Sequence, residues 1–240
     1  MDQINNIEIH LEKYFDRLWP ICRSIVSPGY RESLDILSEI VPFERLEFPT
    51  GKKVLDWTVP EEWDCRDAYF IDSQGVRHAD FKVNNLHILN FSAPFRGKVN
   101  FEEMQKHLYS LPHLPDAVPY ITSYYEKRWG FCISENERKN LPQGDFEVFI
   151  DSVHRHGKLV AGEAVLKGQT KQEILLSSYL CHPSLANNEL SGPLVLAFLY
   201  DALKKKAQRK FTYRFVVVPE TIGSIAYLSK RGEHLRRNVV

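Results

Sequence analysis

The stretch Leu175–Leu203, LLSSYLCHPSLANNELSGPLVLAFLYDAL, decides the fold of this chain. It opens with an almost uninterrupted apolar run, which is typical of a strand buried on both faces of a parallel sheet. A polar loop begins at His182, and apolar residues return at helical spacing from about Ser191. The sequence therefore predicts a strand, a loop and a helix. It leaves three interpretations of the loop open: a metal site, a phosphate cradle or a well-capped turn.

The same order of elements repeats directly afterwards. Residues 211–220, FTYRFVVVPE, predict a second buried strand, residues 224–232 begin another helix, and NVV at 238–240 indicates the start of a third strand. Such a β-α-β-α-β run predicts an α/β layered sheet. Because a strand of three residues is a poor end for a domain, we expect the natural protein to continue beyond Val240.

The residues before this stretch show two kinds of sequence pattern. Residues 4–22 and the residues after a turn at Pro28-Gly29 show helical spacing, and residues 43–51 alternate like a half-buried strand. From about residue 56 to 142 the chain is rich in aromatic residues, short strand-like runs and turns, with a strand expected over 84–91 and a helix capped by Asn100. Residues 144–168 predict a hairpin that turns at His156-Gly157. The aromatic segment therefore predicts a small β-meander between stretches of a different pattern.

Composition excludes several classes of protein. The chain has 240 residues, 43% hydrophobic and 26% charged, with a formal net charge of zero. That composition is typical of a globular protein, and the zero net charge argues against a nucleic-acid or anionic-membrane partner. The basic runs at 204–210 and 230–237 follow expected helices and are interpreted as solvated helix ends. No run of about 18 apolar residues exists, and the four cysteines form no CxxC pair. We expect a cytoplasmic protein with reduced thiols.

Two predicted strands end in residues that can bind a metal. His182 follows the first strand and Glu220 follows the second. In open α/β sheets ligands gather at the carboxyl ends of the strands, so the two side chains are expected at one edge. Imidazole and carboxylate are both zinc ligands, and a carboxylate nearby can take a proton from a metal-bound water. The residues alone leave plainer roles open: a structural histidine, a helix-capping Glu220, and Asn187 and Asn188 as turn formers.

Longer stretches carry a family resemblance. SSYLCHPSLANNELSGPLV and FVVVPETIGSIAYL resemble an aminopeptidase-like family of bacteria and archaea, which is related to zinc aminopeptidases and glutaminyl cyclases. Further matching stretches, including VPEEWDCRDAYF and DFEVFIDSVHRHGKLVAGEAVL, extend the resemblance over nearly the whole chain. The resemblance implies a three-layer α/β fold with helices on both faces of the sheet, formed by residues 1–55 and 143–240. It also implies a small β-rich domain inserted at 56–142, which the aromatic segment fits, and a chain that continues beyond Val240.

The resemblance also implies roles for individual residues. His182 stands at the position of the strand-end histidine ligand, and Asn188 stands where the peptidases carry a bridging aspartate. The peptidases have a Glu-Glu pair after the next strand, where this chain has Pro219-Glu220. We therefore assign His182, Asn188 and Glu220 as metal ligands and Glu189 as the catalytic base, while Glu220 as the base stays open. The remaining ligands of the relatives would lie beyond Val240.

The function implied by this resemblance is zinc-dependent hydrolysis of a peptide or amide bond. One or two zinc ions would activate water toward a peptide or an aminoacyl small molecule. Because Asn188 and Pro219 replace carboxylates, an alternative is a peptidase-like scaffold with altered chemistry that acts as a binding module. A single-zinc, glutaminyl-cyclase-like acyl transfer lies between the two. No nucleic-acid or membrane partner is expected, a homo-oligomer stays open, and these 240 residues alone are expected to bind metal weakly and to lack activity.

Overall fold

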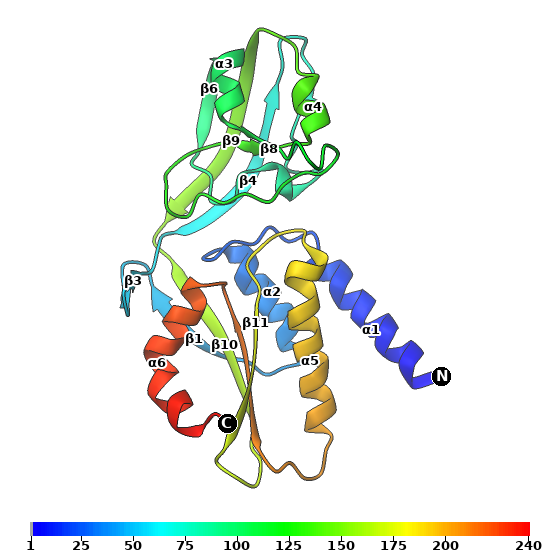
Figure 1. Ribbon diagram of the computed structural model, residues 1–240, viewed down its shortest axis with the longest axis vertical. Coiled ribbons are helices and arrows are strands. Elements are labelled where there is room, and N and C mark those ends of the chain that lie inside the picture. Colours follow the sequence, from blue (N-terminus) through cyan, green and yellow to red (C-terminus); the bar gives the residue numbers. More distant parts are fainter. Residues whose placement is uncertain (1) are drawn as a thin grey trace. The chain divides into compact units, whose positions relative to one another are not determined.

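The computed structural model describes residues 2–240, with side chains from residue 7 onward. The chain forms two units: unit 1 contains the residues up to Glu62 together with His156–Val240, and unit 2 is Trp63–Arg155. The colours of Figure 1 show that one continuous segment, cyan to green, makes up unit 2. Its limits lie later in the sequence than the predicted 56–142, because residues 145–155 belong to the sheet of unit 2.

Unit 1 is built on a mixed four-stranded sheet. Its strand order is β1 (Glu44–Pro49), β10 (Lys158–Leu166), β12 (Thr212–Val218) and β11 (Glu173–Tyr179). The strands β11 and β12, predicted from the two apolar runs, are parallel neighbours, whereas β10 is antiparallel to both β1 and β12. Of the predicted third strand at 238–240, the structure has one isolated parallel bridge, between Val239 and Glu173 of β11, while Asn238 is the last residue of the preceding helix α6 (Ile222–Asn238).

Alternating residues of β10 show that helices cover both faces of this sheet. A Cβ added to Gly162 would lie 2.8 Å from Leu34 Cδ1, so this face packs against α2 (Pro28–Ser38). The next residue, Glu163, points the opposite way, and its Oε2 accepts a 2.6 Å hydrogen bond from the Tyr227 hydroxyl of α6 (Ile222–Asn238). Figure 1 shows α6 and α2 on opposite sides of the sheet.

The helix α5 (Ser191–Lys204), which follows the loop of interest, packs on the α2 side. Its Tyr200 ring makes an edge contact with Phe215 of β12, with centroids 5.2 Å apart. The helix α1 (Asp2–Leu18) packs against both α2 and α5. The predicted α/β fold with helices on both faces of the sheet is therefore confirmed.

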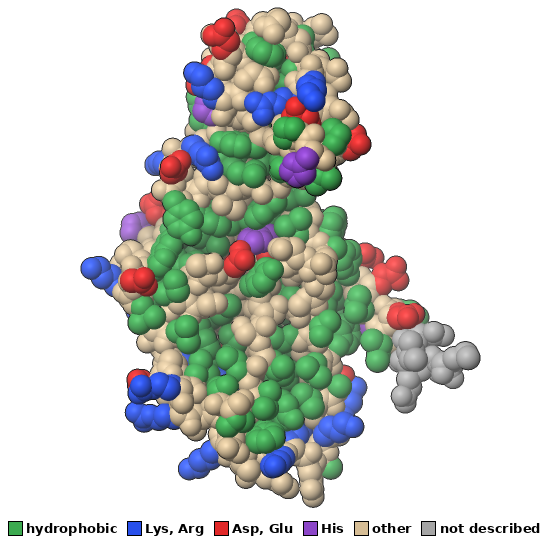
Figure 2. Space-filling view, viewed as in Figure 1, with side chains coloured by type: hydrophobic (Ala, Val, Ile, Leu, Met, Phe, Trp, Pro, Cys, Tyr) green, Lys and Arg blue, Asp and Glu red, His purple; other side chains and the backbone are tan. Residues whose placement is uncertain are grey.

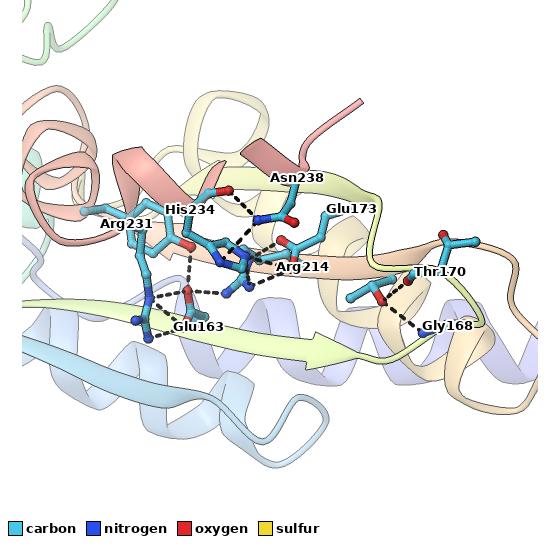
Figure 3. Close-up of polar contacts among 10 residues, drawn as sticks. Glu163, Gly168, Thr170, Glu173, Arg214, Arg231, His234 and Asn238 are labelled. Carbon is cyan, nitrogen blue, oxygen red and sulfur yellow. Dashed lines mark hydrogen bonds and ion pairs between the residues drawn. The ribbon is translucent and has the colours of Figure 1, made fainter. Parts of the chain in front are cut away.

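Buried charges hold α6 on the other face (Figure 3). Arg214 of β12 is only 6% exposed and lies between two carboxylates, 2.7 Å from Glu163 Oε2 and 2.7 Å from Glu173 Oε2. From α6, Arg231 contacts Glu163 at 2.7 Å and His234 contacts Glu173 at 2.9 Å. Each buried charge has an opposite charge beside it, which is the condition for burying charges without a large loss of stability.

The helix α2 begins earlier than predicted. Ser27 is its N-cap, and its Oγ accepts the amide hydrogen of Tyr30, while Pro28 occupies the first helical position. Pro28 and Gly29 therefore lie in the first turn of the helix and do not form a separate turn before it. Proline is favoured at the first helical position because its φ angle is already helical. A Cβ on Gly29 would lie 1.9 Å from the carbonyl oxygen of Cys22, so only glycine fits this close approach.

Unit 2 has its own four-stranded sheet and several short elements. A helix capped by Asn100 forms as predicted. The prediction of a strand over 84–91 is wrong, because this segment contains a 3-10 turn and isolated bridges. The sheet order is β5 (Arg77–His78), β4 (Glu62–Ile71), β9 (Asp145–Arg155) and β6 (Phe95–Asn100). The short elements are β2 (Lys53–Val54) and β3 (Trp57–Thr58), which lie in unit 1, and η1 (Asn85–His87), α3 (Phe101–Lys106), β7 (Leu108–Tyr109), β8 (Phe131–Cys132) and α4 (Glu135–Lys139) in unit 2.

The hairpin predicted over residues 144–168 is wrong. Its first strand, β9, pairs with β6 in unit 2, whereas its second, β10, pairs with β1 and β12 in unit 1. At the expected turn, the Gly157 amide donates to Thr50 Oγ1 at 3.0 Å, and the Gly157 carbonyl accepts from the Thr50 amide at 3.0 Å. A Cβ on Gly157 would lie 2.5 Å from Glu62 Cβ, so the glycine serves a close approach instead of a turn.

Two further expectations concern the surface. Among the described residues, none of the helices has the length and apolar character needed to cross a membrane. Lys204, Lys205 and Lys206 at the end of α5 are exposed, and Lys205 pairs with Asp201 at 2.6 Å. Figure 2 shows basic side chains gathered around this lower end of α5, which fits a solvated helix end.

Candidate metal centre

Two neighbouring strand ends bring an imidazole and a carboxylate together. The last residues of β11 and β12, Tyr179 and Val218, are register partners, so the two strands end at the same edge of the sheet. His182 follows β11 and Glu220 follows β12, and His182 Nε2 lies 3.3 Å from Glu220 Oε2. The arrangement is the one that parallel strand ends predict. The Glu220 side chain is 49% exposed, so this side of the histidine ring faces a solvent-accessible carboxylate.

The other side of the His182 ring is held inside the protein. Its Nδ1 lies 2.8 Å from Glu189 Oε1 and 3.3 Å from Asn188 Oδ1. The second carboxylate oxygen of Glu189 accepts the amide hydrogen of Cys181 at 2.8 Å. Because Glu189 and Asn188 both offer acceptors to Nδ1, the proton of a neutral ring belongs on Nδ1. The lone pair of Nε2 then faces Glu220, which is the orientation that a metal-binding histidine needs.

Asn188 and Glu189 lie on an unusual turn. They belong to a π-helical segment, η2 (Ala186–Leu190), that runs directly into α5. Single π-helical turns are rare and occur frequently at functional sites. This turn leaves Asn188 exposed and directs Glu189 completely inside, at 0% exposure. Glu189, predicted as the catalytic base, thus contacts a ring nitrogen and a backbone amide, and the predicted ligand Asn188 lies on the Nδ1 side of the ring.

Backbone strain marks both loops of the site. Ser184, two residues after His182, has φ +45°, and Thr221, next to Glu220, has φ +55° with ψ −78°. Residues other than glycine rarely adopt a positive φ. For a β-branched residue such as threonine, this backbone conformation costs on the order of 1–3 kcal/mol. Strain of this kind persists where the surrounding structure fixes the backbone, and it clusters at functional sites.

Sequence reasoning missed Cys181. Ligand atoms of Cys181, His182 and Glu189 lie within 4.8 Å of one another, and all three residues are buried. The Cys181 sulfur also accepts the amide hydrogen of Glu220 at 3.2 Å, so it joins the two loops. Burial, and next the negative charge of Glu189, raise the pKa of this thiol well above its usual range. The signal in the sequence was its position directly before His182.

The charge of Glu189 stabilises its hydrogen bond with Nδ1 of His182. Burial lowers the pKa of His182, but the hydrogen bond and charge of Glu189 outweigh it, and the pKa is raised from its usual value. A protonated Cys181 is a poor metal ligand, because the thiolate is the form that binds zinc. Both Glu189 oxygens are already within hydrogen-bond distance of donors. The outward pair, His182 and Glu220, is therefore the better candidate for holding an ion.

The outward pair fits zinc in chemistry and in spacing. Zinc binds imidazole nitrogen and carboxylate oxygen at about 2.0–2.2 Å with tetrahedral geometry, which places two such ligand atoms about 3.4 Å apart. The observed separation of His182 Nε2 and Glu220 Oε2 is 3.3 Å. The two side chains can thus share one ion without a change in the backbone.

Comparison with known proteins assigns the family. Residues 12–240 match the family model described as DUF4910, a domain of unknown function. The chain belongs to this family. This DUF4910 chain is 43% identical over 221 residues to a Clostridium acetobutylicum protein described as a polysaccharide biosynthesis protein with an aminopeptidase-like domain. The match covers 92% of this chain and 51% of that protein, so the chain spans about half the length of this curated relative.

Solved structures place the DUF4910 chain among peptidase-like folds. A crystal structure described as a peptidase from Clostridium acetobutylicum superposes with a TM-score of 0.91 at 40% identity, covering 99% of this chain and 58% of that one. A zinc aminopeptidase from Bacillus subtilis superposes with a TM-score of 0.57 at 11% identity, over 95% of this chain and 67% of that one. A peptidase M28 precursor from Shewanella amazonensis gives a TM-score of 0.57 at 12% identity with the same coverage. The resemblance to the aminopeptidase-like family and the predicted fold are both confirmed.

Proposed function

We propose that this chain supplies part of the active site of a zinc-dependent hydrolase that cleaves a peptide or amide bond. The observation that supports it best is the 3.3 Å separation of His182 Nε2 and Glu220 Oε2 at the shared end of two parallel strands. That spacing suits two ligands of one tetrahedral zinc ion. The fold shared with zinc aminopeptidases supports the same class of chemistry.

Each side chain has a distinct role in this proposal. His182 binds the ion through Nε2, and Glu220 binds it through its exposed carboxylate. Glu189 fixes the ring by accepting a hydrogen bond from Nδ1–H, as a carboxylate behind a metal-bound histidine commonly does. A bound zinc ion polarises a carbonyl group and lowers the pKa of a coordinated water. In contrast to the role expected from the sequence, we assign Glu189 to orientation, because a fully buried carboxylate with two donors beside it has no contact with solvent.

The substrate we propose is a peptide or an aminoacyl amide. The peptidase-like fold of the structural neighbours supports this class. The curated relative is described as a polysaccharide biosynthesis protein, so amides attached to sugars belong in the same substrate screen.

One observation favours a second function. Asn188, at the position where the peptidases carry an aspartate, is exposed and neutral, and an amide is a weaker zinc ligand than a carboxylate. A peptidase-like scaffold that binds the same class of ligand without cleaving it would tolerate this substitution.

Metal binding provides the first test. Zinc affinity is measured by competition with a chromophoric chelator for the wild-type chain and for the variants His182→Ala, Glu220→Gln and His10→Ala. We expect weak binding of one ion, at least a tenfold loss in His182→Ala and Glu220→Gln, and no change in His10→Ala, which alters an exposed histidine of α1. Equal affinity in wild type and His182→Ala contradicts the proposal.

Activity separates the two functions. The natural protein, in any longer form in which it occurs, is assayed on aminoacyl-chromophore amides with zinc, with a chelator, and after zinc is restored. Turnover that follows the zinc supports the hydrolase. Tight zinc and ligand binding without turnover across the substrate screen supports the binding module.

A further inference from the structure

Arg23 is buried beneath the loop that carries His182. Its side chain lies in unit 1 at 0% exposure, and its Nε donates a 3.0 Å hydrogen bond to the carbonyl oxygen of His182. Its Nη1 donates to the carbonyl oxygen of Leu18 at 2.6 Å and lies 3.4 Å from Ser33 Oγ. One guanidinium group therefore joins the candidate metal loop to two segments near the start of the chain.

Both carbonyl groups lie where regular backbone hydrogen bonding ends. Leu18 is the last residue of α1, where carbonyls lose the intrahelical partner, and its carbonyl oxygen accepts the Ile21 amide hydrogen at 3.3 Å in addition to the Arg23 hydrogen bond. His182 lies beyond the end of β11, so its carbonyl is outside the ladder with β12. Hydrogen bonds from a charged donor are stronger than neutral ones, and the planar fork of arginine can serve two acceptors in fixed directions.

A second contact holds the same loop on the same support. Ser184 Oγ lies 3.5 Å from the carbonyl oxygen of Trp19, and Ser184 is one of the strained residues of the site. The segment from Leu18 to Arg23 thus touches the loop at its first and third positions, His182 and Ser184. A strained backbone needs such external contacts to persist.

The segment around Arg23 is itself rigid. Ser27 Oγ accepts the amide hydrogens of Ser24 at 2.9 Å and Tyr30 at 3.1 Å, which closes the turn that follows Arg23. The Tyr30 hydroxyl then donates to the carbonyl oxygen of Val217 in β12 at 3.1 Å. Arg23 is therefore fixed relative to the strand that leads to Glu220.

We propose that Arg23 is a positioning residue for the candidate metal centre. It fixes the backbone of His182 while Glu189 fixes the ring, and the two together direct Nε2 toward Glu220. The zinc-affinity part of this inference rests on the proposed function, whereas the placement of the His182 ring does not.

The first test measures zinc affinity in Arg23→Met and Arg23→Lys. Arg23→Met keeps an unbranched apolar stem but removes every donor, and we expect a loss of about 10- to 100-fold, as for other groups that orient metal ligands. Arg23→Lys keeps the charge but loses the fork, so a smaller loss is expected. The control is Arg214→Met, another buried arginine of unit 1 that contacts Glu163 and Glu173 instead of His182. This control should lower stability and leave the zinc affinity of the folded protein unchanged.

The second test needs no metal. The ring nitrogens of His182 are observed by long-range ¹H–¹⁵N NMR in the metal-free wild type and in the same variants. We expect one narrow set of ring signals in wild type and in Arg214→Met, and broadened or doubled signals in both Arg23 variants. If Arg23→Met does not fold, Arg23→Lys carries the test.

The two tests separate the possible failures. A wild-type protein that binds no zinc, with ring signals that still depend on Arg23, overturns the proposed function and supports the positioning role. Zinc affinity and ring signals that are the same in wild type and in the Arg23 variants overturn the positioning role. Equal losses in Arg23→Met and Arg214→Met also overturn it, because they show a general effect of stability.

Discussion

Glu189 and Glu220 carry the same functional group in opposite environments. Glu189 is fully buried and lies beside the His182 ring and the Cys181 amide, whereas the Glu220 side chain is 49% exposed. A buried carboxylate destabilises the fold unless donors surround it, so the contacts of Glu189 are essential to its burial. An exposed carboxylate such as that of Glu220 has no such requirement and is available to an ion or a substrate. The difference in burial is therefore the reason for assigning Glu189 to orienting His182 and Glu220 to binding the ion.

This difference leads to a stability prediction. Glu189→Ala leaves the buried Cys181 amide and His182 Nδ1 without this acceptor, and we expect the free energy of unfolding to fall by about 3 kcal/mol. Glu220→Ala removes a half-exposed group and should lower it by less than about 1 kcal/mol. Urea unfolding of both variants measures the two values, and similar losses in both contradict the assignment of an orienting role to Glu189.

The sequence predicted part of this site for a clear reason. His182 and Glu220 could be expected to meet because parallel strands bring their carboxyl ends to one edge. The inward direction of Glu189 depends on a π-helical turn, in which an extra residue changes the direction of the side chains, and no sequence rule located that turn. Arg23 is a single arginine in the apolar stretch PICRSIV, where its burial can be suspected but its partner, 159 residues away, cannot.

At the level of elements, the start of α2 depends on one hydroxyl group. Ser27 Oγ accepts amide hydrogens from Tyr30 in the helix and from Ser24 in the preceding turn. Replacing an N-cap serine by alanine costs about 1–2 kcal/mol, and Ser27→Ala should lie at the upper end because it loses both acceptor contacts. Ser38→Ala is the control, since Ser38 near the end of α2 only bonds back to the Leu34 carbonyl. Thermal unfolding checks both, and equal effects contradict the capping role.

The strands β9 and β10 belong to different sheets, which shows a limit of sequence patterns. Two alternating segments joined by His156-Gly157 favour a hairpin by local rules. In the structure the glycine lies beside Thr50 and Glu62, contacts that no local rule contains. A glycine can permit either a turn or the close approach of another segment. Only the tertiary structure shows which of these two roles Gly157 has. The domain limits shift for the same reason, since β9 joins the sheet of unit 2.

In unit 2, His78 links a turn to a helix through two carboxylates. Its Nδ1 lies 3.0 Å from Glu137 of α4, and its Nε2 lies 3.0 Å from Asp72 after β4. The hydrogen bond to Glu137, opposed by burial and reinforced by Asp72, raises the pKa of His78 above its usual 6.5. A raised pKa in the folded state means that the stabilisation is complete below about pH 6.5 and is lost as the pH rises through the folded-state value.

The pH dependence of unfolding tests this link. The free energy of unfolding of unit 2 should fall as the pH is raised from about 6 to 8 in the wild type, and this slope should flatten in His78→Gln. Amide exchange in α4 and β5 reports the same loss locally. A slope that is identical in wild type and variant contradicts the role of His78.

For the whole molecule, one short stretch was enough to predict the class of fold. The strand, loop and helix of residues 175–203, followed by a second buried strand, determine the parallel pair β11–β12 and the helix between them. The antiparallel neighbours β1 and β10 could not be placed, because they come from segments on both sides of unit 2. Pairing between distant segments depends on tertiary contacts more than on local pattern.

The buried charges around Arg214 belong entirely to unit 1, and this leads to a prediction about the whole chain (Figure 3). Arg214→Met leaves Glu163 and Glu173 buried without their shared cation, and breaking such a pair costs about 3–5 kcal/mol. We expect hydrogen exchange to accelerate in β10, β11, β12 and α6, while the strands β4 and β9 of unit 2 keep their wild-type protection. Exchange that accelerates equally in both units would show instead that the 240 residues unfold as one cooperative structure.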